Sequence, residues 1–317
     1  MHVASAYGHM EVTCILVKRG VDATAKDNDK NTPLHVASTN GHVDVACILL
    51  EHGVDMTTHN RDRKTPLHEA SVEGHLEVTR LLIDHRADPI ACKGSSGLEE
   101  TPLHMASIHG HVEVAHFLVE HGVDMETKTS LGWTPLHQAT TFGHLNIARF
   151  LIKQRMDVTA HSQDGQTALH LVSRASFGYM DIARILIEYG TSATAQGNNR
   201  QSPLHVVSSY RNVVVARSLV EWGADMTAQD NNGWTPLHYA SSCGGMESHI
   251  SLSSAVQMQQ HETIMGGLHG MWHQKTDMYR LHISSSRPAR TEQSRKTTRE
   301  HYYMSKRRRE MVTSVAS

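Results

Sequence analysis

A four-residue motif recurs along this chain at nearly constant spacing, and no other feature restricts the possible fold as strongly. The segment Thr32-Pro33-Leu34-His35 returns, unchanged or slightly altered, at Thr65, Thr101, Thr134, Thr167, Ser202 and Thr235. The steps between successive motifs are 33, 36, 33, 33, 35 and 33 residues. His2 lies 33 residues before His35, so the sequence opens inside a further copy. This period predicts an array of small units rather than one closed globule.

Each copy carries the signals of two short helices. Thr32 is a suitable N-cap, and Pro33 follows at the first helical position, where its missing N–H costs nothing. Gly41 can end a helix over residues 34–40 in the left-handed conformation. A second helix is expected over residues 43–52. Its apolar face consists of Val45, Ala46, Ile48 and Leu49.

Two short helices cannot bury their apolar faces alone, whereas stacked copies cover one another. The composition agrees, because only 39% of the residues are hydrophobic and 5% are aromatic, less than one closed core of this size usually contains. We therefore predict an all-α repeat solenoid over residues 1–245, with a polar loop such as 57–64 between successive units. Small side chains at one position in the first helices let neighbouring helices approach closely: Ala37, Ala70, Ala106 and Ala139.

The phrases TPLHxAS, GHxEV and EHGVD, recurring together at 33 residues, resemble the ankyrin repeat. The resemblance covers residues 2–244, with six complete units, an incomplete first unit and a fragment after His238. It implies stacked helix-turn-helix units with β-hairpin-like loops, and motif histidines whose hydrogen bonds tie successive turns together. The scaffold positions that it implies are Thr32, His35, Thr65, His68, Thr101, His104, Thr134, His137, Thr167, His170, His205, Thr235 and His238.

Three sites depart from the regular pattern. Extra residues lie between Cys92 and Glu100 and again at 174–177, and Arg211 replaces the glycine between two helices. A non-glycine residue is strained at that turn if the backbone stays left-handed. These sites are expected irregularities of the stack.

Histidine is abundant, and the repeat explains most of it. Of the 26 histidines, 16 occupy repeat slots: eight close the motif, five follow the turn glycine and three end the second helix. One unit is crowded with His104, His109, His111 and His116, but the H-E-x-x-H zinc pattern is absent. We expect structural histidines and no metal site. Many should titrate near pH 6–7, which predicts an acid-sensitive stack.

Catalytic and cofactor motifs are missing from the sequence. It contains no G-x-G-x-x-G, no phosphate-binding G-x-x-x-x-G-K-[ST] and no G-x-S-x-G elbow. The pair Glu99-Glu100 falls in the loop insertion and is interpreted as solvated charge. Cys14 and Cys47 are 33 residues apart, in equivalent slots, which favours small buried side chains over a disulfide or zinc site. We expect no enzyme activity and no cofactor.

The resemblance implies that a partner protein binds on the concave side, at hairpin tips and at the exposed ends of the first helices. Positions that vary between copies are the best guide within one chain. The predicted tip residues are Asn31, Arg61, Arg63, Lys64, Glu100, Trp133, Gln166, Gln201 and Trp234. The predicted helix-end residues are Thr39, Asn40, Val72, Glu73, Ile108, His109, Thr141, Phe142 and Tyr210. Aromatic and arginine side chains favour interfaces, although Trp133 and Trp234 could equally pack against their own hairpins.

Charge is divided unevenly. Residues 1–245 carry 19 Lys and Arg against 26 Asp and Glu, a net charge of −7, whereas residues 246–317 carry 11 against 6, a net charge of +5. An acidic solenoid argues against nucleic acid as its partner. The segment 246–317 is predicted to be an irregular or disordered basic tail rich in Ser and Arg. Its cluster Lys306-Arg307-Arg308-Arg309 is a nuclear-import signal, a contact for an acidic partner or solvated charge.

The sequence thus predicts a scaffold or adaptor that binds an unidentified protein, with no small-molecule substrate. The alternative is a sensing or regulatory segment of a larger signalling protein, such as a nucleotide-switch protein, a ubiquitin-ligase adaptor or an ankyrin-bearing enzyme. Residues 1–10 lack a basic region followed by an apolar run, and no apolar stretch reaches about 18 residues. We expect a monomer in the cytoplasm or nucleus without a membrane span.

Overall fold

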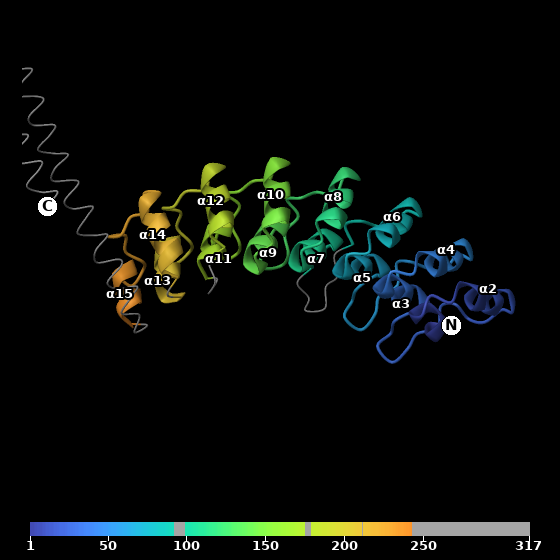
Figure 1. The fold of residues 1–317 in the computed structure, drawn as a ribbon. Coiled ribbons are helices and arrows are strands. Elements are labelled where there is room, and N and C mark those ends of the chain that lie inside the picture. Colours follow the sequence, from blue (N-terminus) through green and yellow to red (C-terminus); the bar gives the residue numbers. More distant parts are fainter. Residues whose placement is uncertain (92–98, 175–178, 211, 243–317) are drawn as a thin grey trace, which may run out of the picture. The chain divides into compact units, whose positions relative to one another are not determined.

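The computed structural model describes residues 1–91, 99–174, 179–210 and 212–242. These residues form fifteen helices in two rows (Figure 1). The first helices of the units are α1 (His2–Ala6), α3 (Pro33–Asn40), α5 (Pro66–Glu73), α7 (Pro102–His109), α9 (Pro135–Phe142), α11 (Ala168–Arg174), α13 (Pro203–Tyr210) and α15 (Pro236–Ser242). The second helices are α2 (Met10–Lys18), α4 (Val43–Glu51), α6 (Leu76–Asp84), α8 (Val112–Glu120), α10 (Leu145–Lys153), α12 (Met180–Glu188) and α14 (Val213–Glu221).

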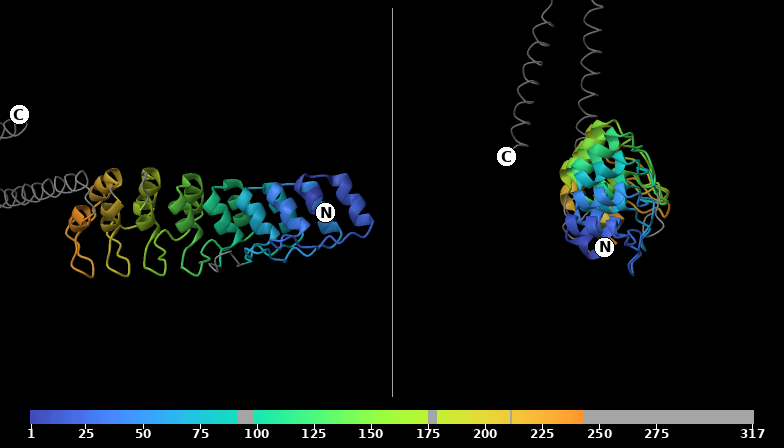
Figure 2. Two further views of the ribbon diagram at one scale, coloured as in Figure 1. Left: turned by 90° about the horizontal axis from the view of Figure 1, so that it is seen from below. Right: turned by 90° about the vertical axis from the view of Figure 1, so that its right-hand side faces the viewer.

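Each helix packs against the corresponding helix of the next unit. First helices contact first helices and second helices contact second helices from one end of the described stack to the other. The loops project together from one side of the two rows, as the view from below shows (Figure 2). The expected all-α solenoid is therefore confirmed.

The motif begins each first helix as its residue types predict. The Oγ1 atom of Thr32 accepts a hydrogen bond from the backbone N–H of His35 at 3.4 Å. In return, the Thr32 N–H donates to Nδ1 of His35 at 3.2 Å, which completes a reciprocal cap. The same paired bonds occur at Thr65, Thr101 and Thr134. Two backbone donors that a helix N-terminus leaves without intrahelical partners are satisfied in this way.

A glycine ends the first helix, and a histidine of the next unit packs onto it. Gly74 has a φ of +78°, and a Cβ atom placed there would lie 2.3 Å from Nδ1 of His111. That ring's Nε2 lies 2.7 Å from the carbonyl oxygen of Val72. Glycine is thus required here twice, by the left-handed backbone and by the neighbouring ring. The histidines that follow the turn glycine are therefore part of the stacking contact.

The core runs along the stack as a seam between the two helix rows. One slot in the second helix is at most 2% exposed in six successive units: Val45, Val78, Val114, Ile147, Ile182 and Val215. The equivalent Val12 in the first unit is 46% exposed, because no unit in this sequence precedes it. The contrast shows that each unit buries this slot under its predecessor, as expected for a stack without a closed core.

The loops between units that the structure describes are tight hairpins. In the first one, the Asp27 N–H donates to the carbonyl oxygen of Asn31 at 3.0 Å, and the Lys30 N–H donates to that of Asp27 at 3.0 Å. Neighbouring loops are joined by single backbone bonds, such as the 2.7 Å bond from the Arg61 N–H to the Asp29 oxygen. One bond per pair is too few for a ladder, and the described residues contain no β-strand.

Several predicted features lie outside the described residues. They are the insertion at 92–98, most of the one at 174–177, Arg211, the tail 246–317 and the basic cluster 306–309. Among the helices that are described, none combines the length and apolar character needed to cross a bilayer.

Candidate partner-binding surface

The motif histidines form a ladder that ties each unit to the next. The Nε2 atom of each ring lies 2.9–3.2 Å from a carbonyl oxygen one unit further along. The partner is always the residue just before the next cap: Asn31, Lys64, Glu100, Trp133, Gln166, Gln201 or Trp234. Because Nδ1 accepts from a backbone N–H, the neutral ring donates through Nε2. The resemblance implies a structural role for these rings, and each of these bonds joins two successive units.

Burial keeps these rings neutral. The pKa values of His35, His68, His104, His137 and His170 fall from 6.5 to about 4, chiefly because burial disfavours the charged form. The expectation of titration near pH 6–7 is therefore wrong for these five histidines. The sequence gives their type and slot, but the shift arises from the packing of the next unit over each ring.

In the described loops, the residues before the caps lie at the hairpin bases and not at the tips, where we expected them. These residues are Asn31, Lys64, Trp133, Gln166, Gln201 and Trp234. Their carbonyl groups accept the bonds of the ladder, and of their side chains only that of Trp234 is exposed. The tips are formed by residues such as Arg61 and Arg63, which are exposed as predicted. Arg61 pairs with Asp29 of the previous tip at 2.8 Å. Both side chains are well solvated, so this ion pair contributes little to stability.

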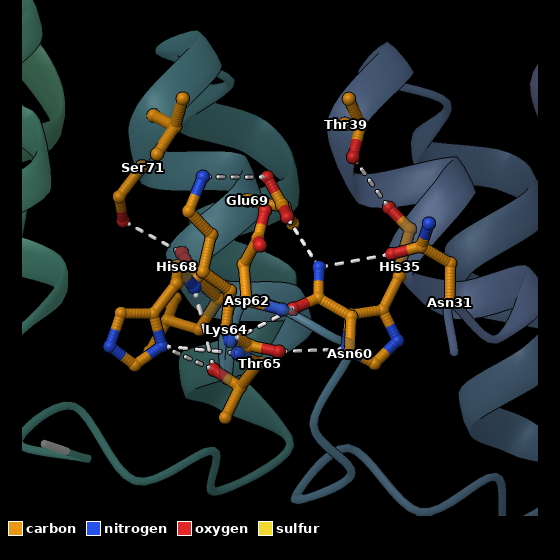
Figure 3. A network of polar contacts seen from close by, with 12 residues as sticks. Asn31, His35, Thr39, Asn60, Asp62, Lys64, Thr65, His68, Glu69 and Ser71 are labelled. Atoms are coloured by element: carbon orange, nitrogen blue, oxygen red, sulfur yellow. Dashed lines mark hydrogen bonds and ion pairs between the residues drawn. The ribbon is translucent and has the colours of Figure 1, made fainter. Parts of the chain in front are cut away.

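A polar network lies at the hairpin base of the second and third units (Figure 3). The Nδ2 group of Asn60 donates to Oδ1 of Asn31 at 3.0 Å and to Oε1 of Glu69 at 2.7 Å. Lys64 Nζ lies 3.6 Å from the other oxygen of Glu69. The predicted residues Asn31 and Lys64 are thus brought together by two residues that the sequence analysis missed, Asn60 and Glu69.

One of the missed residues, Glu69, occupies the slot directly after the motif histidine. The residue type in this slot differs in nearly every unit: Val36, Glu69, Met105, Gln138, Leu171, Val206 and Tyr239. Besides Glu69, two of these side chains make polar contacts: Nε2 of Gln138 donates to Oε1 of Glu100 at 3.2 Å, and Nε2 of Gln201 donates to the Tyr239 hydroxyl oxygen at 2.7 Å. Variation between copies could have identified this slot, because its residue type varies as strongly as the residue types at the predicted positions.

Glu100 corrects a second expectation. It is only 7% exposed, so it is not solvated loop charge. Its carbonyl oxygen accepts from His68 at 3.1 Å, and this bond draws the residue into the stack. Its neighbour Glu99 is exposed, as expected. Membership of the ladder, which every residue before a cap shares, is what holds Glu100 in the stack.

The ends of the first helices vary in exposure. Asn40, Glu73, His109, Phe142 and Tyr210 are exposed, and Phe142 and Tyr210 are 49% and 44% exposed. The three half-buried positions are Thr39, Ile108 and Thr141. Val72 is only 9% exposed, so the prediction that it belongs to an open binding surface is wrong. It lies beneath the next unit, whose His111 bonds to its carbonyl oxygen.

The two tryptophans that precede caps differ. Trp234 is 42% exposed and packs edge-on against Tyr239, with ring centroids 5.3 Å apart. Trp133 is half-buried, and its backbone N–H donates to Oγ1 of Thr129 at 3.1 Å. Gln166 is likewise half-buried and accepts from Arg174 at 3.2 Å. Trp234 therefore packs locally and still presents a ring to solvent.

These repeated units also match a known family. The family model described as ankyrin repeats (3 copies) matches residues 1–91, 90–162, 122–197, 152–230 and 175–255. The chain belongs to the ankyrin-repeat family. Ankyrin repeats are generally protein–protein interaction modules and typically non-catalytic binding scaffolds.

A solved ankyrin structure shows the same architecture. The crystal structure of the human ASB11 ankyrin repeat domain is similar to this chain with a TM-score of 0.63 and 25% sequence identity. The similarity covers 71% of this chain and 97% of that one. No curated protein sequence matches significantly. Ankyrin surfaces carry no common ligand, so the family alone does not identify a partner.

Proposed function

We propose that this ankyrin-repeat chain is a scaffold or adaptor that binds a partner protein along the loop side of its stack. We define the loop-side surface as the hairpin tips, the hairpin bases and the exposed ends of the first helices. This is the side that the family resemblance identifies as concave. The proposal includes no catalysis, small-molecule substrate or nucleic acid, and it assumes a monomer in the cytoplasm or nucleus.

One observation carries the proposal: large apolar side chains are exposed on this surface where the scaffold does not require them. Phe142 and Tyr210 occupy the same helix-end slot, where other units have Asn40, Glu73 and His109. Since the slot accepts polar residues without loss of the fold, the exposed rings are not needed for stacking. Exposed aromatic side chains among polar neighbours are typical of binding anchors.

The test is an affinity purification with the full-length chain as bait. The double variant Trp133→Ala/Phe142→Ala should lose proteins that the unaltered bait retains, because both side chains lie on the proposed surface. Tyr189→Ala is the matched control, since Tyr189 is 52% exposed but follows α12 in the other helix row. All baits must first show the same thermal unfolding midpoint. Equal retention by all three baits would remove the support for this surface.

A further inference from the structure

The described residues bury three carboxylates on the loop-side surface, and two of them are well supplied with partners. Glu69 is 8% exposed and has Lys64 at 3.6 Å and the Asn60 amide at 2.7 Å. Asp230 is 3% exposed and accepts from the hydroxyl group of Tyr239 at 2.7 Å. Two backbone N–H groups also donate to Asp230, at 2.8 and 2.9 Å. Each of these charges is compensated within the chain.

Glu100 is different. Its carboxylate accepts one hydrogen bond among the described residues, from the neutral amide of Gln138 at 3.2 Å. An ionised carboxylate has about four acceptor positions, so the described residues leave most of its capacity unused. Burial raises the pKa of this group, and the more distant positive charge of Lys64 offsets the rise only in part. A buried carboxylate that lacks a cation or several donors is costly, which makes an external donor favourable.

The position of Glu100 suits contact with a partner. The residue directly precedes Thr101, the cap of α7, and Gln138 belongs to α9 of the next unit, so the carboxylate bridges two units. Gln138 and Phe142 are four residues apart and therefore share a face of α9. Phe142 is 49% exposed. An anionic acceptor and an exposed aromatic ring thus lie close together on one surface.

We infer that Glu100 receives a lysine or arginine side chain of the partner protein, next to an apolar contact on Phe142. This inference rests on the proposed function and adds the chemistry of the partner. A cation at Glu100 would fill the unused acceptor positions and compensate the buried charge. The partner segment would carry a basic residue followed or preceded by an apolar one.

A random peptide library tests the inference with the full-length chain as target. Peptides selected by the unaltered chain should share a Lys or Arg at one aligned position beside an apolar residue. Glu100→Gln removes the charge and keeps the shape, and it should weaken a selected peptide by about thirtyfold or more. Glu113→Gln is the matched control, because Glu113 is an exposed carboxylate on α8, and it should leave the affinity unchanged.

The possible outcomes separate the inference from the proposed function. If peptides are selected without a shared basic position, or bind Glu100→Gln as tightly as the unaltered chain, the inference is wrong and the binding surface remains. If no peptide depends on Phe142 or Trp133, the proposed surface itself fails. A lower unfolding midpoint in Glu100→Gln would mean that the charge supports folding, and the composition of peptides selected by the unaltered chain would then decide.

Discussion

Two sets of positions in the stack lie a few ångströms apart and follow opposite rules. The motif slots hold nearly the same residue types in every complete unit, and in each one the N–H of the capping residue donates to Nδ1 of the motif histidine, as in Thr134 and His137. The slot after the motif histidine and the residue before the cap change from unit to unit. The cause lies in the ladder, where His137 bonds to the backbone carbonyl of Gln166 and not to its side chain. Any residue supplies that carbonyl, so the side chain is free to serve recognition.

Acid should produce the largest difference between the two sets. A histidine with a pKa of 6.5 when unfolded and about 4 when folded binds a proton more readily in the unfolded chain. Its contribution to stability is complete above pH 6.5 and is lost as the pH falls toward 4. Between pH 7.5 and 5.5, each of the five motif histidines should cost about 1.3 kcal/mol, roughly 6 kcal/mol together. The midpoint temperature of thermal unfolding should therefore fall by more than about 10 °C between pH 7.5 and 5.5.

The comparison of thermal unfolding at two pH values also has an outcome that would contradict the account. Coincident melting curves at pH 5.5 and 7.5 would mean that the motif rings are accessible to protons in the folded chain. Glu100→Gln and Phe142→Ala should show the same pH shift as the unaltered chain, because neither side chain belongs to the ladder. A smaller shift in either variant would show that its side chain influences the protonation of the motif histidines, so the two sets of positions would not be independent.

Removal of one motif ring should be the next largest effect. His137→Leu replaces the imidazole ring with an apolar side chain of similar size in a slot that is 1% exposed. It leaves the Thr134 N–H and the Gln166 carbonyl group without their partner, at a cost of about 3 kcal/mol. His161→Leu is the control at an exposed histidine and should change stability by less than about 0.5 kcal/mol. Chemical denaturation of both variants measures the difference.

The turn glycines give a smaller effect with an internal control. Gly53 and Gly74 both have positive φ, but a Cβ on Gly53 would meet nothing within 4 Å, whereas one on Gly74 would meet the His111 ring. Gly53→Ala should cost about 1 kcal/mol for the left-handed backbone. Gly74→Ala should cost about 1 kcal/mol more, because the ring must also move. If chemical denaturation gave equal losses in the free energy of unfolding for the two variants, the His111 ring would move aside without cost.

Substitutions on the loop-side surface should have the smallest effect on folding. Phe142→Ala and Tyr210→Ala remove exposed rings from a slot that holds polar residues in other units. We expect changes within about 0.5 kcal/mol in the free energy of unfolding. A loss above about 2 kcal/mol in either variant would show that these rings belong to the scaffold.

The regular part of the fold could be predicted from the sequence because its determinants are local. A Thr-Pro pair begins a helix and a glycine ends it, and both signals act within a few residues of Thr32 and Gly41. The burial of Val45 also follows, because a 33-residue period brings an equivalent helix beside it. These are effects of backbone geometry and repetition, which require no knowledge of particular neighbours.

The candidate surface was harder to predict because it depends on contacts between units. Glu100 is adjacent to a loop insertion in the sequence, yet it is buried and its carbonyl oxygen accepts a bond from His68. Val72 is one residue from exposed Glu73 but points under the next unit. The depressed histidine pKa values have the same origin, since the burial of each ring is completed by a segment about 30 residues away.

The central claim is that each helix pair is stable only because it packs on its neighbours. Hydrogen exchange measured by mass spectrometry on His137→Leu tests this claim most directly. Because His137 joins its own unit to the next, amide protection should fall in α9 and α11 together and remain near its original level in α3 and α5. A loss confined to α9, or one spread equally over all fifteen helices, would contradict the account.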